Sequence, residues 1–214
     1  ALLLYTQGQY AEALALNQRV LAVREKALGP EHQETAHSLN NLAMVYWAQG
    51  RYDQAVVHYE RALVVHEKAT GPTHPNTATI LNDLASLYWT QGRYAQALPH
   101  FQRALAIREK SLGPESPLTA SSLNALAEIY RAQGQYEQAL PLYQRALAIN
   151  EKVLGPDHRS TASTLNYLAM LYRAQGRYAE ALPYYQRALS IREKALGPEH
   201  PDTAQSLNNL AVLF

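Results

Sequence analysis

The sequence of 214 residues contains no cysteine. Disulfide frameworks, thiolate nucleophiles and cysteine-based zinc sites are therefore excluded together. Nineteen basic and 18 acidic side chains leave a formal net charge of +1, which argues against a nucleic-acid partner because such binders normally present a strongly basic surface. No apolar run approaches the roughly 18 residues that a bilayer-spanning helix needs, so we expect no membrane partner. The apolar share of 47% nevertheless indicates a folded protein.

Glycine is also scarce, and its spacing indicates the architecture. Gly50 stands in a Gln-Gly-Arg-Tyr context and Gly71 in a Gly-Pro context, and the two contexts alternate along the chain. The period is therefore 42 residues with two elements in each repeat, which is typical of a solenoid. The ten glycines, each 21 residues after the previous one, are Gly8, Gly29, Gly50, Gly71, Gly92, Gly113, Gly134, Gly155, Gly176 and Gly197.

Between the glycines the apolar residues follow a helical period. Leu39, Leu42, Ala43 and Tyr46 recur at i, i+3, i+4 and i+7, as on one face of a helix. Gly-Pro after such a segment is a helix stop signal. Each repeat is thus predicted to be a helix hairpin, with a first helix of about 15 residues and a second of about 19. The first helices are expected to begin near Thr35, Thr77, Thr119, Thr161 and Thr203.

Three second helices contain an internal proline, at Pro99, Pro141 and Pro183. Because the apolar period continues through each proline, we expect a slight bend and not a helix end. The repeats are expected at 35–76, 77–118, 119–160 and 161–202, with partial repeats at 1–34 and 203–214. A solenoid normally ends in polar caps, and the sequence shows none, so we expect a piece of a longer protein.

These residues resemble the tetratricopeptide repeat (TPR). Its Trp-x2-Leu-Gly-x2-Tyr pattern corresponds here to Leu39-x2-Leu42-Ala43-x2-Tyr46, and its later Ala-x3-Phe to Ala55-x3-Tyr59. The resemblance implies an all-α, right-handed superhelical solenoid of antiparallel helix hairpins. The 42-residue period, with Gln-Gly-x-Tyr and Glu-Lys-x-Leu-Gly-Pro, is similar to the kinesin light chain type. Similar arrays are found in bacterial proteins, sometimes behind nucleotide-binding signalling domains.

In TPR arrays the first helices line a concave groove, and one stripe of each first helix is expected to face it. One position of that stripe is asparagine in all five copies: Asn40, Asn82, Asn124, Asn166 and Asn208. Amides carry donors and acceptors suited to the backbone of an extended peptide, and the kinesin light chain resemblance implies that they hold peptides. Alternatively, each amide bonds the neighbouring repeat or merely survives from duplication.

The remaining stripe positions vary, and the variation predicts what the groove prefers. Tryptophans are typical interaction hot spots, and arginines can capture carboxylates. We therefore predict a peptide or partner segment with an aromatic anchor and acidic residues. Alternatively, the tryptophans pack between repeats and the arginines are merely solvated. The variable candidate residues are Met44, Trp47, Ser86, Trp89, Glu128, Arg131, Met170 and Arg173.

Enzyme activity finds little support in the sequence. Every glycine lies at an expected helix end, so no phosphate-binding loop is present. His32, His74, His158 and His200 recur in the Gly-Pro loops, a full repeat apart, which is too far to share a metal ion. They are expected to help begin the next helix instead, and no cofactor, metal or catalytic residue is predicted.

Two functions remain compatible with the sequence. The first is a protein-interaction module that binds a partner segment in the groove. The second is a rigid or self-associating scaffold, or the sensor repeat of a larger signalling protein, because exposed terminal hairpins favour end-to-end stacking. A cytoplasmic location is the expectation that accompanies both.

Overall fold

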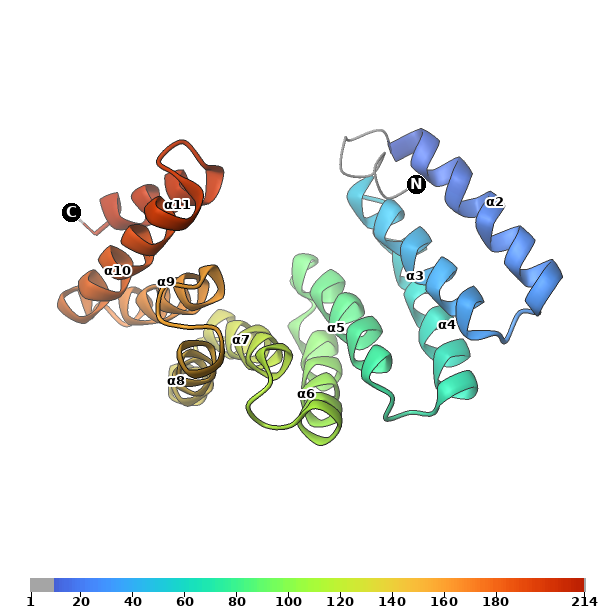
Figure 1. The fold of residues 1–214 in the computed structure, drawn as a ribbon, viewed down its shortest axis with the longest axis horizontal. Coiled ribbons are helices and arrows are strands. Elements are labelled where there is room, and N and C mark those ends of the chain that lie inside the picture. The colour runs from blue at the N-terminus through green and yellow to red at the C-terminus, as the bar shows by residue number, and fades with distance from the viewer. Residues whose placement is uncertain (1–9, 214) are drawn as a thin grey trace. The chain divides into compact units, whose positions relative to one another are not determined.

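The computed structural model describes residues 10–213. These residues form ten α-helices and no β-strand, which confirms the all-α prediction (Figure 1). The chain separates into two compact units, unit 1 (residues 1–107) and unit 2 (residues 108–214), and the boundary falls inside α6. Residues 1–9 of the partial repeat expected at 1–34 lie outside the described residues.

The first helix of each repeat begins two residues before the threonine that was expected to mark it. Each of these threonines is fully buried, and its hydroxyl donates to the carbonyl oxygen of the Gly-Pro glycine six residues earlier, as Thr35 does to Gly29 at 2.8 Å. The threonine thus closes the loop between two hairpins. The five helices are α3 (Gln33–Ala48), α5 (Pro75–Thr90), α7 (Pro117–Ala132), α9 (Arg159–Ala174) and α11 (Pro201–Ala211).

Histidines cap the N-termini of four of these helices, as the loop positions predicted. The His32 Nδ1 atom accepts a hydrogen bond from the Glu34 backbone N–H at 3.1 Å, and Ser116 takes the same role for α7 through its hydroxyl. Such a cap satisfies one of the N–H groups that the first turn leaves without a helical partner. The other capping histidines are His74, His158 and His200.

The second helices start at a tyrosine and run without interruption through the internal prolines. Pro99, Pro141 and Pro183 each lie inside their helix and are solvent-exposed. The prediction that they do not end the helices is confirmed. Exposure lets water bond the carbonyl that each proline leaves without its helical donor. The five helices are α2 (Tyr10–Leu28), α4 (Tyr52–Thr70), α6 (Tyr94–Leu112), α8 (Tyr136–Val153) and α10 (Tyr178–Leu196).

Two glycine conformations end the helices. Gly50, between α3 and α4, has φ +71°, within the left-handed region that asparagine also tolerates. Gly71, after α4, has φ +96° and ψ 155°, a combination that is essentially restricted to glycine. No atom stands within 4 Å of a Cβ built at either position, so backbone conformation and not crowding explains why glycine recurs at these helix ends.

Small residues allow the helices of each unit to approach closely. In unit 1, α3 packs against α4, and in unit 2, α7 packs against α8 and α9 against α10. The alanines at these contacts, such as Ala43, Ala55 and Ala62, are fully buried. Leucines and tyrosines of the predicted core face, such as Leu39 and Tyr59, fill the remaining interior without exposed surface. The core of each unit therefore follows the apolar period of the sequence.

Candidate functional site

The predicted candidate residues recur at the same positions of the first helices and form a stripe within each unit, on α3 and α5 in unit 1 and on α7, α9 and α11 in unit 2. We call it the first-helix stripe. Most of its side chains are partly buried, Asn166 is buried, and Trp89 and Asn208 are exposed. Its members are Asn40, Met44, Trp47, Asn82, Ser86, Trp89, Asn124, Glu128, Arg131, Asn166, Met170, Arg173 and Asn208.

Asparagines of the stripe bond the next repeat within each unit. Asn40 Nδ2 lies 3.3 Å from Asp83 Oδ2, and Asn124 Nδ2 donates to Thr164 Oγ1 at 2.8 Å. Asn166 Oδ1 accepts from the Nδ2 of the asparagine at 209, also at 2.8 Å. Three of the five asparagines therefore connect neighbouring first helices, which was the structural alternative left open by the sequence.

The amide oxygens of Asn40, Asn82 and Asn124 find no hydrogen-bond partner among the described residues, although all three are buried. A buried polar atom without a partner is uncommon in folded proteins and has an energetic cost. In these three asparagines, the neighbouring repeats thus leave the amide oxygen without a hydrogen bond.

A hollow recurs at the same place in both units, between first helices of adjacent repeats. In unit 1 its volume is about 150 Å³, and His37, Asn40 and Thr79 are among its lining residues. In unit 2 it is about 260 Å³, and residues 121, 124 and 163, which are 84 positions later in the repeat, line it. Because equivalent positions line both hollows, the feature recurs between the units and is not one local irregularity.

The two tryptophans differ in exposure. Trp89 keeps 39% of its surface exposed, whereas Trp47 is half-buried on α3. Trp89 therefore offers more apolar area on the first-helix stripe of unit 1 than Trp47 does.

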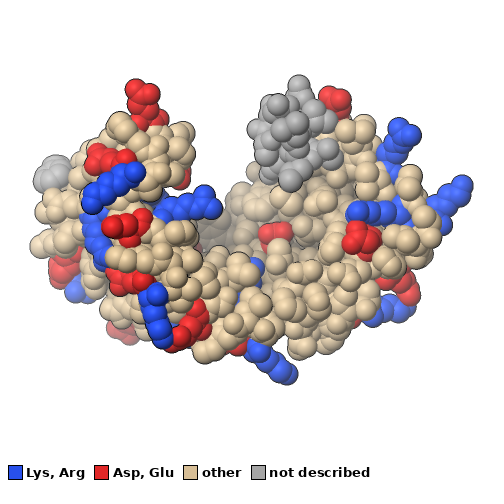
Figure 2. Space-filling view, in the orientation of Figure 1, with Lys and Arg blue, Asp and Glu red and all other residues tan. Residues whose placement is uncertain are grey.

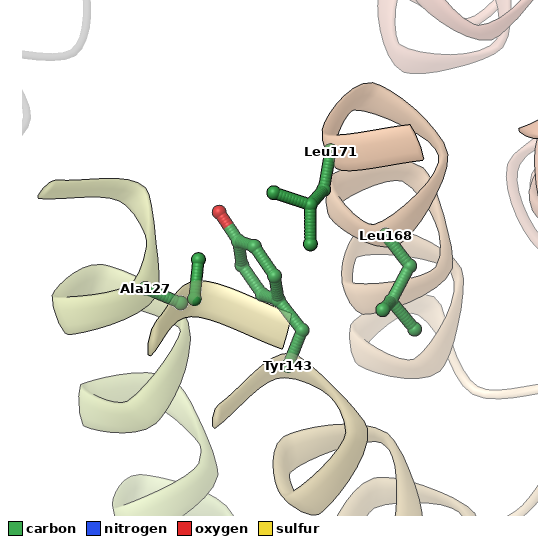
Figure 3. Close-up of a cluster of buried hydrophobic side chains, with 5 residues drawn as sticks. Ala127, Tyr143, Leu168 and Leu171 are labelled. Atoms are coloured by element: carbon green, nitrogen blue, oxygen red, sulfur yellow. The ribbon is translucent and has the colours of Figure 1, made fainter. Parts of the chain in front are cut away.

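Arg131 is already engaged by the protein. Its Nε and Nη2 atoms donate to the two carboxylate oxygens of Glu128, each at 2.9 Å. The Tyr143 hydroxyl donates to the same carboxylate. Tyr143 projects from α8 between Ala127 of α7 and the leucines 168 and 171 of α9 (Figure 3). The stripe in this repeat therefore presents a neutralised ion pair where the sequence suggested a basic position.

The pKa values of this cluster follow from its burial and pairing. Burial raises the pKa of the Tyr143 hydroxyl, and the negative charge of Glu128 raises it further. The hydrogen bond to Glu128 raises the pKa of Arg131, against the opposing effect of burial. Both groups therefore keep their protons throughout the physiological range and remain hydrogen-bond donors to Glu128.

The next repeat holds a different arrangement at the same positions. The Arg173 side chain makes no hydrogen bond or ion pair with any residue from 10 to 213, and Met170 stands where the previous repeat has its glutamate. The Tyr185 hydroxyl is buried without a partner in that range. Burial raises the pKa of Tyr185, and the charges of Arg173 and Arg131 act in the opposite direction.

A row of buried polar residues on the second helices was not anticipated from the sequence. Arg192 on α10 donates to the Asp202 carbonyl at 3.0 Å and to the Ser206 hydroxyl at 2.8 Å. Such bonds join one hairpin to the next. The sequence did contain a signal for these bonds. Where the second-helix residue is arginine, the residue 14 positions later is serine, and where it is asparagine, that residue is threonine. The pairs are Arg24–Ser38, Arg108–Ser122, Asn150–Thr164 and Arg192–Ser206.

The recurring arginines of the second helices also form contacts between repeats. Each pairs with a glutamate 36 positions earlier at 2.5–2.6 Å. These pairs are substantially exposed, so each contributes at most about 1 kcal/mol. Figure 2 accordingly shows basic and acidic side chains interspersed over the visible described surface. The pairs are Arg61–Glu25, Arg103–Glu67, Arg145–Glu109 and Arg187–Glu151.

Between residues 10 and 213, no group of three or more histidine and acidic side chains is arranged to hold a metal ion. Within the same range, no helix combines the length and the apolar character that crossing a membrane requires.

Comparisons with known proteins agree with this geometry. The model of the tetratricopeptide repeat family matches residues 1–63, 38–110, 84–152, 118–194 and 160–214. No curated protein matches the chain.

Solved structures share the fold over nearly the whole chain. A putative kinesin light chain from Podosopora anserina, with nearly identical TPR-like repeats, is 30% identical over 90% of this chain and 92% of its own, with a TM-score of 0.76. BtubC (BKLC) from P. vanneervenii gives 24% identity over 95% of this chain and 82% of its own, with a TM-score of 0.80. The apo form of RapI is 20% identical over 96% of this chain and 54% of its own, with a TM-score of 0.77.

The two lower identities establish the fold alone, whereas the family model covers the chain from end to end. TPR arrays of this fold are protein–protein interaction modules, and they are generally not catalytic. The chain belongs to the tetratricopeptide repeat family, with structural neighbours among the kinesin light chain-like TPR proteins.

Proposed function

We propose that the first-helix stripe binds an extended segment of a protein partner, with the recurring hollow of each unit as the contact point. The observation that supports this most directly is the repetition of the hollow at Asn40 in unit 1 and at Asn124 in unit 2. In both hollows the asparagine oxygen lacks a partner among the described residues. A backbone N–H of an extended peptide would supply the donor that each oxygen lacks.

The partner segment is proposed to carry an aromatic or apolar anchor beside acidic residues. The exposed area of Trp89 provides an apolar contact in unit 1, and large aromatic contacts dominate the energetics of most interfaces. Arg173 provides a guanidinium for an acidic residue in unit 2, whereas Arg131 is excluded from this role because Glu128 already neutralises it.

Filling the hollow is expected to abolish peptide selection. A random peptide display library panned against the protein should enrich segments with an aromatic residue, and the double variant Ser121→Leu with Ser163→Leu should lose that enrichment at least tenfold. Both serines line the unit 2 hollow, and neither bonds the neighbouring repeat, so the substitutions occupy space while the Asn124–Thr164 bond stays intact.

The matched control places the same two leucines on the exposed surface of the second helices, as Gln144→Leu with Gln186→Leu. It should enrich the same peptides as the unaltered protein. Enrichment that survives in the serine variant, or no enrichment by the unaltered protein, would contradict the proposed site.

A second candidate, self-association, is favoured by one observation on α2. Leu16, Val20 and Val23 are 38%, 40% and 59% exposed and line a shallow hollow of about 360 Å³. If two chains pack through this face, Val20→Glu with Val23→Glu should remove concentration-dependent mass in sedimentation. Val64→Glu, at a 64% exposed position on α4, should leave it unchanged. A chain that is monomeric at all concentrations would eliminate this candidate.

A further inference from the structure

The repeat at 119–160 contains a complete receptor for a carboxylate. Arg131 donates two hydrogen bonds of 2.9 Å to the Glu128 carboxylate, and the Tyr143 hydroxyl, carried by the second helix, donates a third. Bidentate arginine with a supporting hydroxyl is among the strongest arrangements for holding a carboxylate. The glutamate side chain is 15% exposed, so the bound carboxylate is largely withdrawn from water.

The repeat at 161–202 keeps the donors and loses the acceptor. Arg173 and Tyr185 stand 42 positions after Arg131 and Tyr143, but Met170 stands 42 positions after Glu128. Among residues 10–213 the buried Tyr185 hydroxyl has no partner, and the Arg173 guanidinium makes no hydrogen bond or ion pair. An unpaired buried donor costs free energy, and a native structure normally has a reason to keep one.

Methionine suits the role of a displaceable cover. Met170 is partly buried and packs against the cluster that contains Tyr185. Its unbranched side chain adapts readily to a new neighbour. The first two full repeats lack the arginine of this arrangement, because their corresponding residues are Trp47 with Tyr59 and Trp89 with Phe101.

We propose that Arg173 and Tyr185 form a vacant carboxylate receptor that takes an acidic group of the bound partner segment in the way that Arg131 and Tyr143 take Glu128. This inference rests on the proposed function and specifies its chemistry in unit 2. The Glu128 carboxylate then plays the part of the ligand in its own repeat, where it occupies the receptor so that no external acid binds.

The receptor can be tested first without any ligand. Met170→Glu should supply the carboxylate from within the chain, as Glu128 does, and raise the Tm by roughly 2–4 °C. Met44→Glu is the matched control, because Met44 and Met170 both lie near the amide of the asparagine four residues earlier, but the neighbour of Met44 is Trp47 and not an arginine. The control should lower the Tm or leave it unchanged. A Met170→Glu variant that behaves like the control overturns the receptor.

The second test uses the peptide display library. The unaltered protein should enrich peptides that carry acidic residues as well as an aromatic one, and Met170→Glu should lose the acidic preference about tenfold while keeping the aromatic one. If the receptor binds an acidic side chain, replacing that side chain of a selected peptide by its amide should reproduce the loss. If it binds the terminal carboxylate, amidating the C-terminus of the peptide should reproduce it instead.

The outcomes separate the two proposals. Enrichment of aromatic peptides without an acidic preference overturns this inference and leaves the proposed function intact. Absence of any enrichment overturns both. Retention of the acidic preference by Met170→Glu places the acid elsewhere and overturns the receptor alone.

Discussion

Replacing Glu128 by methionine is expected to lower the free energy of unfolding of unit 2 by about 3 kcal/mol. The substitution removes the acceptor for Arg131 and Tyr143 together, and breaking a largely buried ion pair by deleting one partner typically costs about 3–5 kcal/mol. The lower end applies because the Arg131 side chain keeps 20% exposure and can turn toward water. Urea unfolding of the variant against the unaltered chain measures the difference.

The control is a combination that the sequence already contains. Glu128→Met with Arg131→Trp reproduces the Met44, Trp47 and Tyr59 arrangement of unit 1, so at least half of the lost stability should return. A single variant that costs less than about 1 kcal/mol, the value of an ordinary exposed pair, would contradict the buried-receptor description of this cluster.

Acid is expected to destabilise unit 1 before unit 2, through His66. This side chain on α4 is fully buried, and its ring lies 5.9 Å from that of His37 and 5.3 Å from that of His74, measured between centroids. Burial, followed by the nearby charges of His74 and His37, lowers the pKa of His66 from 6.5 to about 4. Unit 2 has no histidine at this position, where its repeats carry Arg108, Asn150 and Arg192.

The hydrogen bonds around His66 suit its neutral form. Its Nδ1 atom lies 3.0 Å from the Thr70 hydroxyl and 3.1 Å from that of Thr77. Both hydroxyls donate their own hydrogens to backbone carbonyls, of His66 and Gly71 respectively. The Nδ1 atom therefore carries the proton and donates to them, while the buried Nε2 atom has no partner among the described residues. Adding a second proton would place a charge there.

The direction of the pH effect follows from the two pKa values. Between pH 6.5 and about 4 the unfolded chain binds a proton at His66 that the folded chain does not. The stability of unit 1 is therefore complete above pH 6.5 and falls as the pH decreases toward 4, by roughly 1–2 kcal/mol at pH 5. Thermal unfolding between pH 7.5 and 5 measures this fall.

A double variant isolates the histidine from the other groups that titrate in this range. His66→Arg with Ile80→Ser reproduces the Arg108–Ser122 pair of unit 2 and removes the titrating ring. The fall between pH 7 and 5 should therefore shrink by most of its value. An undiminished fall in the double variant would exclude His66 as its source.

Local signals in the sequence were sufficient for the helices. The glycine spacing indicated the period because the helix ends at Gly50 and Gly71 require positive φ, and the loop histidines indicated the helix starts because a cap acts within two residues. The threonines misplaced those starts by two residues, since Thr35 is not the cap but the residue that bonds back to Gly29. The Glu128–Arg131 pair was also within reach, because residues three apart on one helix are neighbours.

The sequence by itself therefore determined the repeat, the helix boundaries to within two residues and the apolar face, all of which depend on residues a few positions apart. Only the tertiary structure decided which polar groups have partners. Tyr143 meets Glu128 from a different helix, Asn124 bonds Thr164 in the next repeat, and Tyr185 is left without an acceptor within the described chain. A side-chain hydrogen bond depends on atoms within about 3 Å, and helix packing alone brings residues that are distant in the sequence to that separation.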